Sequence, residues 1–425
     1  MENNQLKNVP ATFSEAFWFW LKLGFISFGG PAGQIATMHQ ELVEKRRWIS
    51  EERFLHALNY CMVLPGPEAQ QLATYLGWLM HRSLGGIVAG TLFILPSLFI
   101  LIGLSWIYIT LGHTTTINSV FGMIKPAVVA IVLHAAHRIG TKTLKNQTLW
   151  MVAIASFIAI FLFNLPFPVI VLGAGLTGYF FNKKEIGFTK YEGEANDSSF
   201  NKSTLLIYLA IGLLLWLLPI SFLFFTYGWQ HSYTQMSWFF TKAALLTFGG
   251  AYSVLPYVYQ MAVDHYHWLS SAQMLDGLAL GETTPGPLIM VVAFVGFIGG
   301  YSKELMGSDQ LLIAGITGAV IATWFTFLPS FLFILLGAPW IEATRNNLKF
   351  SGPLSAITAA VVGVIINLAI FFSYHVFWPR GINQEIDLLA ISVSTFTSLL
   401  LFKMKWSILR IMILCTILGI IKSLI

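Results

Sequence analysis

The chain has 425 residues, of which 56 % are hydrophobic and 10 % are charged, and its formal net charge is +5. A soluble domain has about 25 % charged residues, so this composition excludes a soluble protein of this size and makes lipid the solvent for much of the surface. The positive charges lie in a few loops, which indicates membrane topology and not a nucleic-acid-binding surface. The two cysteines, Cys61 and Cys415, lie in apolar stretches and predict neither a disulfide framework nor a metal site.

The chain begins with a polar segment up to Thr12 that lacks the basic and then apolar order of a signal peptide. We therefore expect the first apolar segment to remain in the mature protein. Two apolar segments follow, residues 13–44 and 52–80, and each is interrupted by glycine and proline, as Phe-Gly-Gly-Pro at 28–31 and Leu-Pro-Gly-Pro at 64–67. Proline removes backbone donors and glycine tolerates positive φ, so a helix must end at each motif.

The remaining apolar segments are long enough to cross a bilayer, which takes about 20 residues in a helix. Only helices and closed barrels satisfy their backbone groups in lipid, so we predict an all-α integral membrane protein. A polar linker over residues 182–203 separates two groups of spans. The predicted spans are 84–111, 117–137, 147–163 and 166–181 before the linker, and 204–227, 311–341, 352–372, 386–402 and 408–421 after it.

The chain contains an internal duplication, in which residues 17–67 return as residues 237–287 at a constant offset (249 − 29 = 220). The second copy repeats both breaks, as Phe-Gly-Gly at 248–250 and Pro-Gly-Pro at 285–287. Other matched pairs are Trp18 and Trp238, Phe19 and Phe239, Lys22 and Lys242, Trp48 and Trp268, and Ser50 and Ser270. The duplication predicts three regions, which are a first repeat over 1–182, a linker with an extra span over 183–232, and a second repeat over 233–425.

The two copies differ in the charge of one loop. The first copy has four basic residues between Lys45 and Arg53, whereas residues 256–273 of the second copy contain no lysine or arginine. Because lysine and arginine stay on the cytoplasmic side, we predict that the copies are inverted, as in many secondary transporters. If each broken segment is a hairpin, the other basic loops also fall inside. The predicted fold is two inverted halves, each with two broken, hairpin-like helices and about four full spans, joined through one extra span.

The breaks are the predicted binding site. A helix that begins inside the membrane presents unpaired N–H groups and a positive dipole end, which favours an anion such as a small oxyanion. Pro31, Pro67 and Pro287 each stand where a new helix would begin. The alternative is that glycine and proline only let helices pack closely. The predicted substrate-binding residues are Lys22, Ser27, Phe28, Gly29, Gly30, Pro65, Gly66, Pro67, Gln70, Lys242, Thr247, Gly249, Gly250, Thr284, Pro285, Gly286 and Pro287.

Charged side chains near the breaks carry two further predictions. Lys22 and Lys242 lie at equivalent positions before the Phe-Gly-Gly breaks; a lysine inside a span is usually functional, so both are candidates to attract the anion, unless they reach out to the interface. Glu68, Glu282 and Asp276 are the candidates for proton coupling, because a carboxylate in a low-dielectric cavity can carry a proton. For Glu68 the alternative is a favourable anion in the first turn of a helix.

Neutral polar side chains near the breaks could donate to an oxyanion, although serine and threonine also bond back to their own helix. They are Ser27, Gln70, Gln71, Thr247, Thr283 and Thr284. The sequence has no Walker A motif, no Gly-x-Ser-x-Gly elbow and no His-Glu-x-x-His pair. We therefore expect no enzyme, no cofactor, no metal and no ATP drive within this chain.

Four motifs carry a family resemblance. They are Phe-Ile-Ser-Phe-Gly-Gly-Pro at 25–31, Leu-Pro-Gly-Pro at 64–67, Thr-Phe-Gly-Gly-Ala-Tyr at 247–252 and Glu-Thr-Thr-Pro-Gly-Pro at 282–287. Their order and spacing resemble the long, two-domain members of the chromate ion transporter family, over nearly the whole chain. The resemblance implies a multi-pass protein of the plasma membrane that exports chromate, driven by the proton gradient, with sulfate as an analogue or competitor. Ala251 stands where the first copy has Pro31, so the halves differ at that break.

Three hypotheses about function follow. The first is a secondary transporter for chromate or a sulfate-like tetrahedral dianion, with the breaks as its site. The second is a passive anion channel of the same fold, which never moves its ion against a gradient. The third is an intramembrane enzyme acting on a lipid-linked phosphate; it would need a nucleophile or metal cluster near the breaks, and Cys61 fits a buried structural cysteine better. The expected partners are the oxyanion and the lipid bilayer, and a homodimer is left open.

Overall fold

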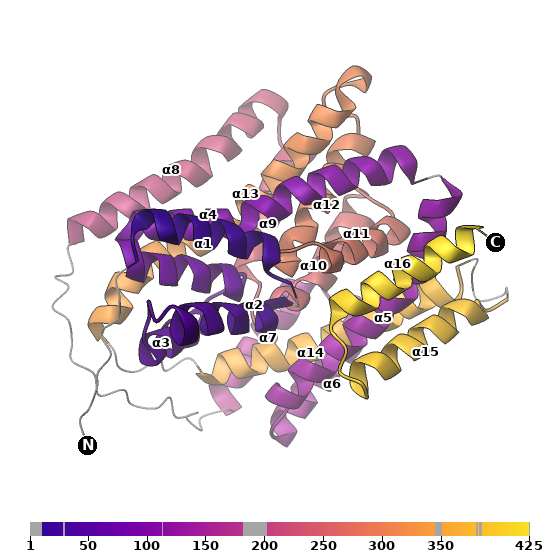
Figure 1. The fold of residues 1–425 in the computed structure, drawn as a ribbon, viewed down its shortest axis with the longest axis horizontal. Coiled ribbons are helices and arrows are strands. Elements are labelled where there is room, and N and C mark those ends of the chain that lie inside the picture. Colours follow the sequence, from indigo (N-terminus) through magenta and orange to yellow (C-terminus); the bar gives the residue numbers. More distant parts are fainter. Residues whose placement is uncertain are drawn as a thin grey trace.

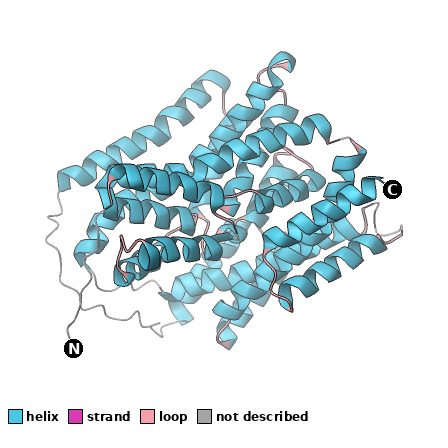
Figure 2. Cartoon of the chain, in the orientation of Figure 1, coloured by secondary structure: helices cyan, strands magenta, loops and turns pink. Residues whose placement is uncertain are grey.

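The computed structural model describes residues 11–28, 30–112, 114–181, 202–344, 351–379, 381 and 385–424. All regular secondary structure in these ranges is helical, as Figure 2 shows. Five helices of the described chain are long and apolar enough to cross a membrane, and further apolar helices are shorter. The prediction of an all-α membrane protein is therefore confirmed.

The elements follow the duplication in order (Figure 1). The first repeat holds α1 (Phe13–Ile26), α2 (Gly30–His39), the π-helical turn η1 (Gln40–Lys45), α3 (Glu51–Val63), α4 (Glu68–Leu111), α5 (Thr115–Thr143), α6 (Gln147–Phe163) and α7 (Phe167–Phe181). Helix α8 (Lys202–Tyr227) comes next. The second repeat holds α9 (Ser232–Leu245), η2 (Ala251–Ser253), α10 (Leu255–Tyr259), the π-helical turn η3 (Gln260–His265), α11 (Ser271–Thr283), η4 (Leu288–Met290), α12 (Val291–Ser302), η5 (Ser308–Gln310), α13 (Leu311–Thr344), α14 (Ser351–Phe377), α15 (Leu388–Phe402) and α16 (Ile408–Leu424).

Equivalent local signals begin the second hairpin of each repeat. The side chain of Ser50 accepts a hydrogen bond from a backbone N–H in the first turn of α3, and the side chain of Ser270 does the same for α11. Serine at this position satisfies one of the unpaired donors at a helix start. A π-helical turn precedes both caps, at Gln40–Lys45 and at Gln260–His265. The duplication is thus preserved in its caps and turns as well as in its breaks.

Helices α3 and α4 form a re-entrant hairpin. α3 has 13 residues, which is about 20 Å at 1.5 Å per residue, and the hydrocarbon core is about 30 Å thick. α4 leaves helical geometry at His81 and Arg82. Gly77, before this kink, lies against Gly85 and Ala89 after it, so the two parts of α4 run antiparallel. The rings of Tyr60 in α3 and Tyr75 in α4 are 5.7 Å apart across the break, so the broken segment predicted over 52–80 turns back before it crosses. The kink joins it to the next span as one helix.

The first broken segment of each repeat also returns toward the side on which it began. After the Phe-Gly-Gly break the chain comes back along α1, and the ring of Trp48 contacts that of Phe19 at 5.6 Å between centroids. In the second repeat Trp268 contacts Phe239 at 5.8 Å. The two pairs are related by the offset of 220 (268 − 48 = 220), so both repeats fold this segment in the same way.

The two repeats are inverted relative to each other. Helices α4 and α13 pack side by side, and Gly86 and Gly90 of α4 lie against Leu335 and Phe331 of α13, in that order. The two helices therefore run antiparallel, and Figure 1 shows them crossing the molecule together. Because α13 is the counterpart of the second part of α4, this packing confirms the inverted orientation that the loop charges predict.

A second motif pair, not found from the offset of 220, identifies α4 and α13 as counterparts. Pro96-Ser97 of α4 matches Pro329-Ser330 of α13 at a larger offset (330 − 97 = 233). The second repeat has a longer connection between α12 and α13, where the first repeat has only the kink of α4, and this accounts for the added residues. The same offset relates α5 to α14.

The last helices of each repeat pack on the other repeat. Helices α6 and α7 lie against α14, and α15 and α16 lie against α5; Figure 1 shows α5 between α15 and α16. Small residues allow close approach at these contacts, as where Gly178 of α7 meets Gly352 of α14 and Gly419 of α16 meets Val120 of α5. The repeats are therefore intertwined in space, and the division at 1–182, 183–232 and 233–425 stays a prediction about the sequence.

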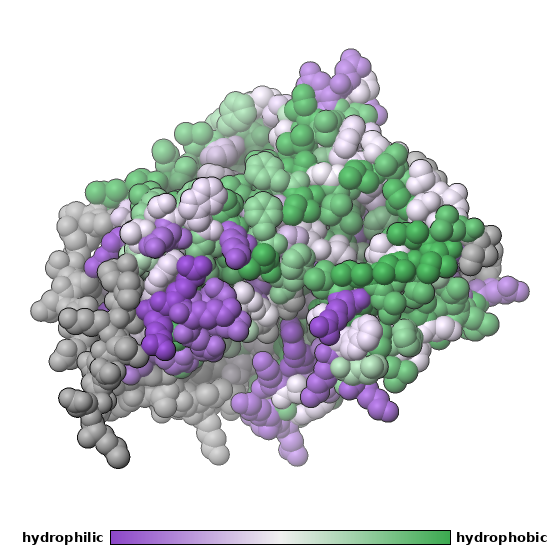
Figure 3. Space-filling view, viewed as in Figure 1, coloured by the Kyte–Doolittle hydropathy of each residue, from purple (hydrophilic) through white to green (hydrophobic). Residues whose placement is uncertain are grey.

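The outer surface is apolar to an extent that lipid explains. In the most apolar window of α8 only 6 % of the residues are buried, and large side chains such as Leu214, Leu218 and Phe225 are exposed. Figure 3 shows hydrophobic residues spread broadly over the helices and hydrophilic residues gathered in separate patches. Such a surface needs a bilayer around it, because large exposed apolar areas are rare on soluble monomers.

Candidate functional site

Two reciprocal hydrogen bonds join the breaks of the two repeats. The backbone N–H of Gly66 donates to the carbonyl oxygen of Thr247 at 2.7 Å, and the N–H of Gly286 donates to the carbonyl oxygen of Ser27 at 2.7 Å. Ser27 and Thr247 each precede a Phe-Gly-Gly motif. Each Pro-Gly-Pro break is therefore held against the Phe-Gly-Gly break of the other repeat. We call this meeting point of residues 27–28, 30–31, 64–68, 247–251 and 284–288 the junction.

Glycine is required at the centre of both Pro-Gly-Pro breaks. The φ angle is +125° at Gly66 and +105° at Gly286, a region that residues with a Cβ rarely adopt. A Cβ on Gly66 would meet the hydroxyl of Ser330, and a Cβ on Gly286 would meet Ser97 at 2.7 Å. These two serines are site residues that the sequence prediction missed. The Pro-Ser pair repeated at an offset of 233 was the signal that would have located them.

The other predicted backbone residues lie at the same junction. Phe28 and Pro65 are half-buried, and Gly29 lies outside the described residues. The buried prolines are Pro67, Pro285 and Pro287, and the glycines with positive φ are Gly30, Gly249 and Gly250. Helix α2 begins at Gly30 and helix α4 begins directly after Pro67. Two helix starts therefore meet at the junction. Pro287, the third predicted start, leads into the 3-10 turn η4, and α12 begins only at Val291.

Buried glutamines brace the junction from the first repeat. Gln34 donates through Nε2 to the carbonyl oxygen of Gly286 at 2.6 Å, and Gln71 donates to that of Pro65 at 2.7 Å. Gln70 donates to a neighbouring threonine at 3.0 Å. The side-chain oxygens of all three are buried without a hydrogen-bond partner among the described residues. Such oxygens are costly unless they accept a hydrogen bond, so they suit water or a ligand that carries a proton.

The threonine hydroxyls at the junction bond to their own helices. Thr247 and Thr284 each donate to the carbonyl oxygen four residues earlier at 2.7 Å, and Thr283 donates to its own helix as well. This local bonding competes with donation to a ligand. The hydroxyl of Ser27, in contrast, is buried without a partner within the described chain. Of the predicted hydroxyl donors, Ser27 therefore has the best reason to bind a ligand.

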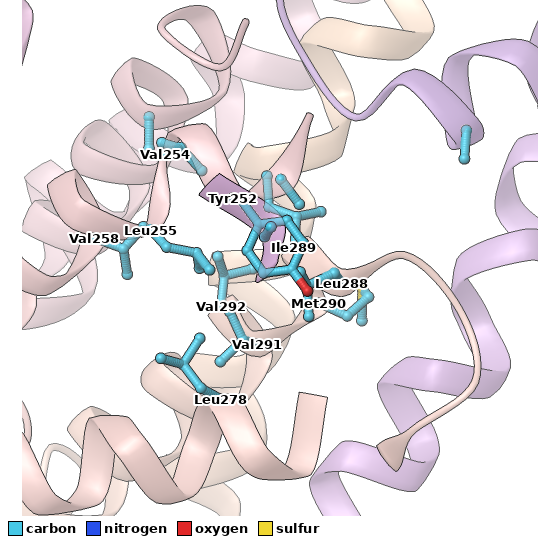
Figure 4. Close-up of a cluster of buried hydrophobic side chains, with 14 of the residues drawn as sticks. Tyr252, Val254, Leu255, Val258, Leu278, Leu288, Ile289, Met290, Val291 and Val292 are labelled. Carbon is cyan, nitrogen blue, oxygen red and sulfur yellow. The ribbon is translucent and has the colours of Figure 1, made fainter. Parts of the chain in front are cut away.

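The two Pro-Gly-Pro breaks lie in different surroundings. Glu68, Gln70 and Gln71 follow the first break. The second break leads into buried hydrophobic side chains, and Figure 4 shows these residues clustered with others from η2, α10 and α11. The labelled members of the cluster are Tyr252, Val254, Leu255, Val258, Leu278, Leu288, Ile289, Met290, Val291 and Val292. The residues that follow the first break are therefore polar, whereas those that follow the second break are apolar.

Helix α5 supplies positive charge to two of the predicted acids. Glu282 accepts a hydrogen bond from the hydroxyl of the buried Tyr252 at 2.5 Å. Arg138 of α5 is close enough for its charge to act on both Glu282 and Glu68. Lys142, one turn further along α5, also acts on Glu68. One helix of the first repeat thus links an acid from each repeat.

Asp276, the third predicted acid, lies in a different cluster. The hydroxyl of Tyr108 donates to its Oδ2 at 2.9 Å, and Nζ of Lys125 lies 3.2 Å from its Oδ1. The sequence prediction missed Lys125, although a lysine inside a predicted span is itself a signal of function. The offset of 220 does not extend to α5, so the comparison of repeats did not single this residue out.

The two predicted lysines have separate surroundings. Lys22 is exposed. Nζ of Lys242 lies 5.8 Å from the centroid of the Trp238 ring, a distance at which a cation is attracted to an aromatic face, and Trp238 packs in turn toward Trp216 of α8. Their role in attracting an anion stays a prediction.

The junction offers carboxylates, amides, a serine hydroxyl and helix starts, with cations from α5. Within the part of the chain that the structure describes, no group of three His, Cys, Asp or Glu side chains could hold a metal ion. Cys61 and Cys415 are buried free cysteines. These groups can hold a small ion and exchange protons with it.

Comparison with known proteins identifies the family of the chain. The model of a family described as chromate transporter matches residues 14–179 and 234–420. The chain belongs to the chromate transporter family. It is 32 % identical over 399 residues to a chromate transport protein of Pseudomonas aeruginosa, which covers 93 % of this chain and 88 % of that protein. It is 29 % identical over 360 residues to a chromate transport protein of Cupriavidus metallidurans, covering 84 % of this chain and 82 % of that one.

A shorter protein matches part of the chain. A Bacillus subtilis protein described as an uncharacterized transporter is 32 % identical over 162 residues, which are 38 % of this chain and 78 % of that protein. That relative therefore matches a stretch about as long as one repeat. No solved structure shows significant similarity to the chain. Family membership and the apolar helices together make this protein a multi-pass transporter of the plasma membrane.

Proposed function

We propose that the protein exports chromate, or a sulfate-like tetrahedral dianion, by alternating access coupled to protons. The observation that carries this proposal is the reciprocal pair of hydrogen bonds from Gly66 to Thr247 and from Gly286 to Ser27. The pair holds the breaks of two inverted repeats at one junction, and secondary transporters of inverted-repeat design bind their substrate at such places. Relatives described as chromate transport proteins support the substrate class.

The start of α2 is the part of the junction best suited to an anion. Helix α2 begins at Gly30 and has no acidic residue in its first turn, so its N–H groups and dipole are not offset by a carboxylate. Helix α4 begins with Glu68, which places its own negative charge at the equivalent favourable position. The free hydroxyl of Ser27 stands just before α2 and adds a donor. We therefore place the oxyanion at the start of α2.

Glu68 and Glu282 are the proposed proton carriers. The positive charge of Arg138 acts on both, so the two acids share one local field. Like charges oppose each other, and a dianion beside these carboxylates favours their protonated form. Departure of the dianion leaves Arg138 to stabilise them as anions. Binding of the dianion and protonation of the two acids are therefore linked to each other.

Transport by purified protein in liposomes tests the proposal. We expect saturable chromate uptake that sulfate inhibits, and accumulation above the bath concentration when a pH gradient is imposed. A protonophore should remove the accumulation but leave downhill flux. Chromate that equilibrates without accumulating under any gradient would establish a passive channel instead. Liposomes without protein, under the same gradients, provide the control for leakage.

A further inference from the structure

An ion pair between a buried aspartate and a partly buried lysine lies outside the junction. Nζ of Lys125 is 3.2 Å from Oδ1 of Asp276, and the hydroxyl of Tyr108 donates to Oδ2 at 2.9 Å. The side chain of Asp276 is 5 % exposed and that of Lys125 is 28 % exposed. Charges inside a membrane protein are costly and face its interior or a wet path. We therefore expect this cluster to have a function. The proposed proton carriers, Glu68 and Glu282, are not part of it and do not account for Lys125.

The cluster ties the two repeats together at one end of the molecule. Tyr108 lies in the last turns of α4, Lys125 lies on α5, and Asp276 lies on α11 of the second repeat. The ring of Trp106 near the end of α4 lies 6.3 Å from that of Tyr301 near the end of α12. The connections after α4 and after α12 therefore share this end, which the loop charges predict to be extracellular.

The packing around this cluster has no equal at the other end. Helix α11 packs against α5, and η2 and α10 pack against α14. Among the described elements, the counterpart helices α3 and α2 make no comparable packing with α14 or α5. Inverted repeats with unequal packing are closed at one end, and here the closed end is the one that holds Lys125 and Asp276. The ion pair is thus part of a closed outer side.

The counterpart of Lys125 shows where this position lies in the alternative state. At the offset of 233 its counterpart is Thr358 (358 − 125 = 233). A Cβ on Gly249 would lie 3.1 Å from Thr358, so Thr358 faces the second Phe-Gly-Gly break. When inverted repeats exchange conformations, Lys125 takes the corresponding place against the first Phe-Gly-Gly break. That break is the one at which α2 begins and at which we place the oxyanion.

We propose that Lys125 is a substrate-binding residue, that Asp276 occupies it while the outer side is closed, and that the oxyanion replaces Asp276 as the outer side opens. This inference rests on the proposed transport function. The exchange keeps the lysine paired while the outer side opens, which matters because an unpaired buried charge is strongly destabilising. Asp276, once released, keeps its hydrogen bond from Tyr108 and faces the water that enters the opened side. The ion pair therefore holds the outer side closed and also occupies the substrate-binding lysine until that side opens.

Binding of radiolabelled chromate to the purified, detergent-solubilised full chain tests this inference. Lys125→Gln should weaken binding about tenfold or more, and Asp276→Asn should strengthen it severalfold, because loss of a charged hydrogen bond partner changes affinity by about this much. Lys303→Gln removes an exposed lysine of the outer loop and should bind as the unaltered protein does. Thermal unfolding without chromate, measured for each variant, separates binding from folding.

A charge swap distinguishes a ligand from a structural tie. Lys125→Asp combined with Asp276→Lys retains an ion pair between α5 and α11, so it should keep the unfolding temperature near that of the unaltered protein while chromate binding stays as weak as in Lys125→Gln. Three outcomes would each overturn this inference but leave the proposed function standing. They are restored binding in the swap, unchanged binding in Lys125→Gln, and no gain in Asp276→Asn. If the unaltered protein binds neither chromate nor sulfate, the proposed function falls and this inference falls with it.

Discussion

At the first Pro-Gly-Pro break the chain continues into α4 with Glu68, Gln70 and Gln71, whereas at the second break it continues with Leu288, Met290 and Val291. The backbone is the same at both places, since Gly66 and Gly286 have positive φ and donate equivalent 2.7 Å hydrogen bonds across the junction. The side chains are not the same. The duplication has kept its geometry in two copies, but polar side chains follow the break in only one.

The same contrast extends to the helices around the junction. Lys125 and Arg138 of α5 correspond at the offset of 233 to Thr358 and Phe371 of α14, so the cations belong to the first repeat. Two geometric copies are enough to exchange open and closed shapes, because each repeat can adopt the conformation of the other. One set of charges is enough to bind one substrate. The comparison therefore separates two parts of the molecule. The backbone geometry that changes conformation is common to both repeats, and the charged binding site is not duplicated.

The largest expected effect comes from breaking the shared geometry. Gly66→Leu and Gly286→Leu should each reduce chromate flux in liposomes to below about one hundredth, since backbone strain costs about 1–3 kcal/mol and the new side chain would also meet Ser330 or Ser97. Gly103→Leu in α4, where no atom lies within 4 Å of an added Cβ, is the matched control. Gly66→Ala and Gly286→Ala, checked for folding by size-exclusion chromatography, should also be impaired. Normal flux in either break variant would show that the two breaks are not equivalent.

A smaller effect should follow when one acid of the unduplicated chemistry is neutralised. Glu68→Gln and Glu282→Gln should each lower proton-driven chromate accumulation by about 5- to 150-fold, the range of a typical coupling between two sites. Exchange of labelled for unlabelled chromate, which needs no net proton movement, should persist. Because Arg138 acts on both acids, the double variant should lose less than the product of the two single losses. Accumulation that survives in both single variants would remove these acids from the coupling.

Making the first break resemble the second should lower the free energy of unfolding. Gln71→Val introduces the residue type that stands at position 291 and removes the donor to the carbonyl oxygen of Pro65. A buried acceptor left without a partner costs about 1–3 kcal/mol, which urea unfolding in mild detergent would measure. Gln147→Val, at an exposed site, should stay within about 0.5 kcal/mol. Equal stabilities for the two variants would mean that the glutamine does not brace the break.

The sequence predicted the parts of this architecture that depend on the backbone. The offset of 220 located all four breaks, and the loop charges gave the inversion that α4 and α13 confirm by packing antiparallel. Glycine and proline act through φ and missing donors, so their effect can be inferred without knowledge of neighbours. The hairpins followed from the loop charges, and the all-helical fold followed from segment length.

The parts that depend on partners could not be inferred from the local pattern. The hydrogen bonds of Thr247 and Thr284 to their own helices, and the packing of α15 and α16 on α5, are set by tertiary contacts. Ser97, Ser330 and Lys125 were within reach of the sequence, because a second offset of 233 relates α4 and α5 to α13 and α14. A search at one fixed offset ends where the first insertion occurs. The roles of the named site residues stay predictions.

The smallest expected effect concerns a contact that both repeats make with different chemistry. His39 bonds to Glu51 at 2.6 Å, and at the offset of 220 Tyr259 bonds to Ser271 at 2.8 Å. Both contacts tie the turn after the first hairpin to the start of the second. Glu44 also lies 3.2 Å from His39, and all three side chains of this ion-pair group are partly or largely exposed.

Replacing the first contact by the second therefore isolates geometry from charge. His39→Tyr combined with Glu51→Ser should change the free energy of unfolding by less than about 1 kcal/mol, because exposed ion pairs contribute little and the neutral hydrogen bond takes their place. Chromate flux should stay within about twofold. A twofold change in flux corresponds to well under 1.4 kcal/mol. Glu51→Ser alone leaves His39 with Glu44 and serves as the comparison. A loss of more than about 2 kcal/mol in the double variant would show that charge, and not the shared geometry, holds this turn, and would extend the asymmetry of the repeats beyond the junction.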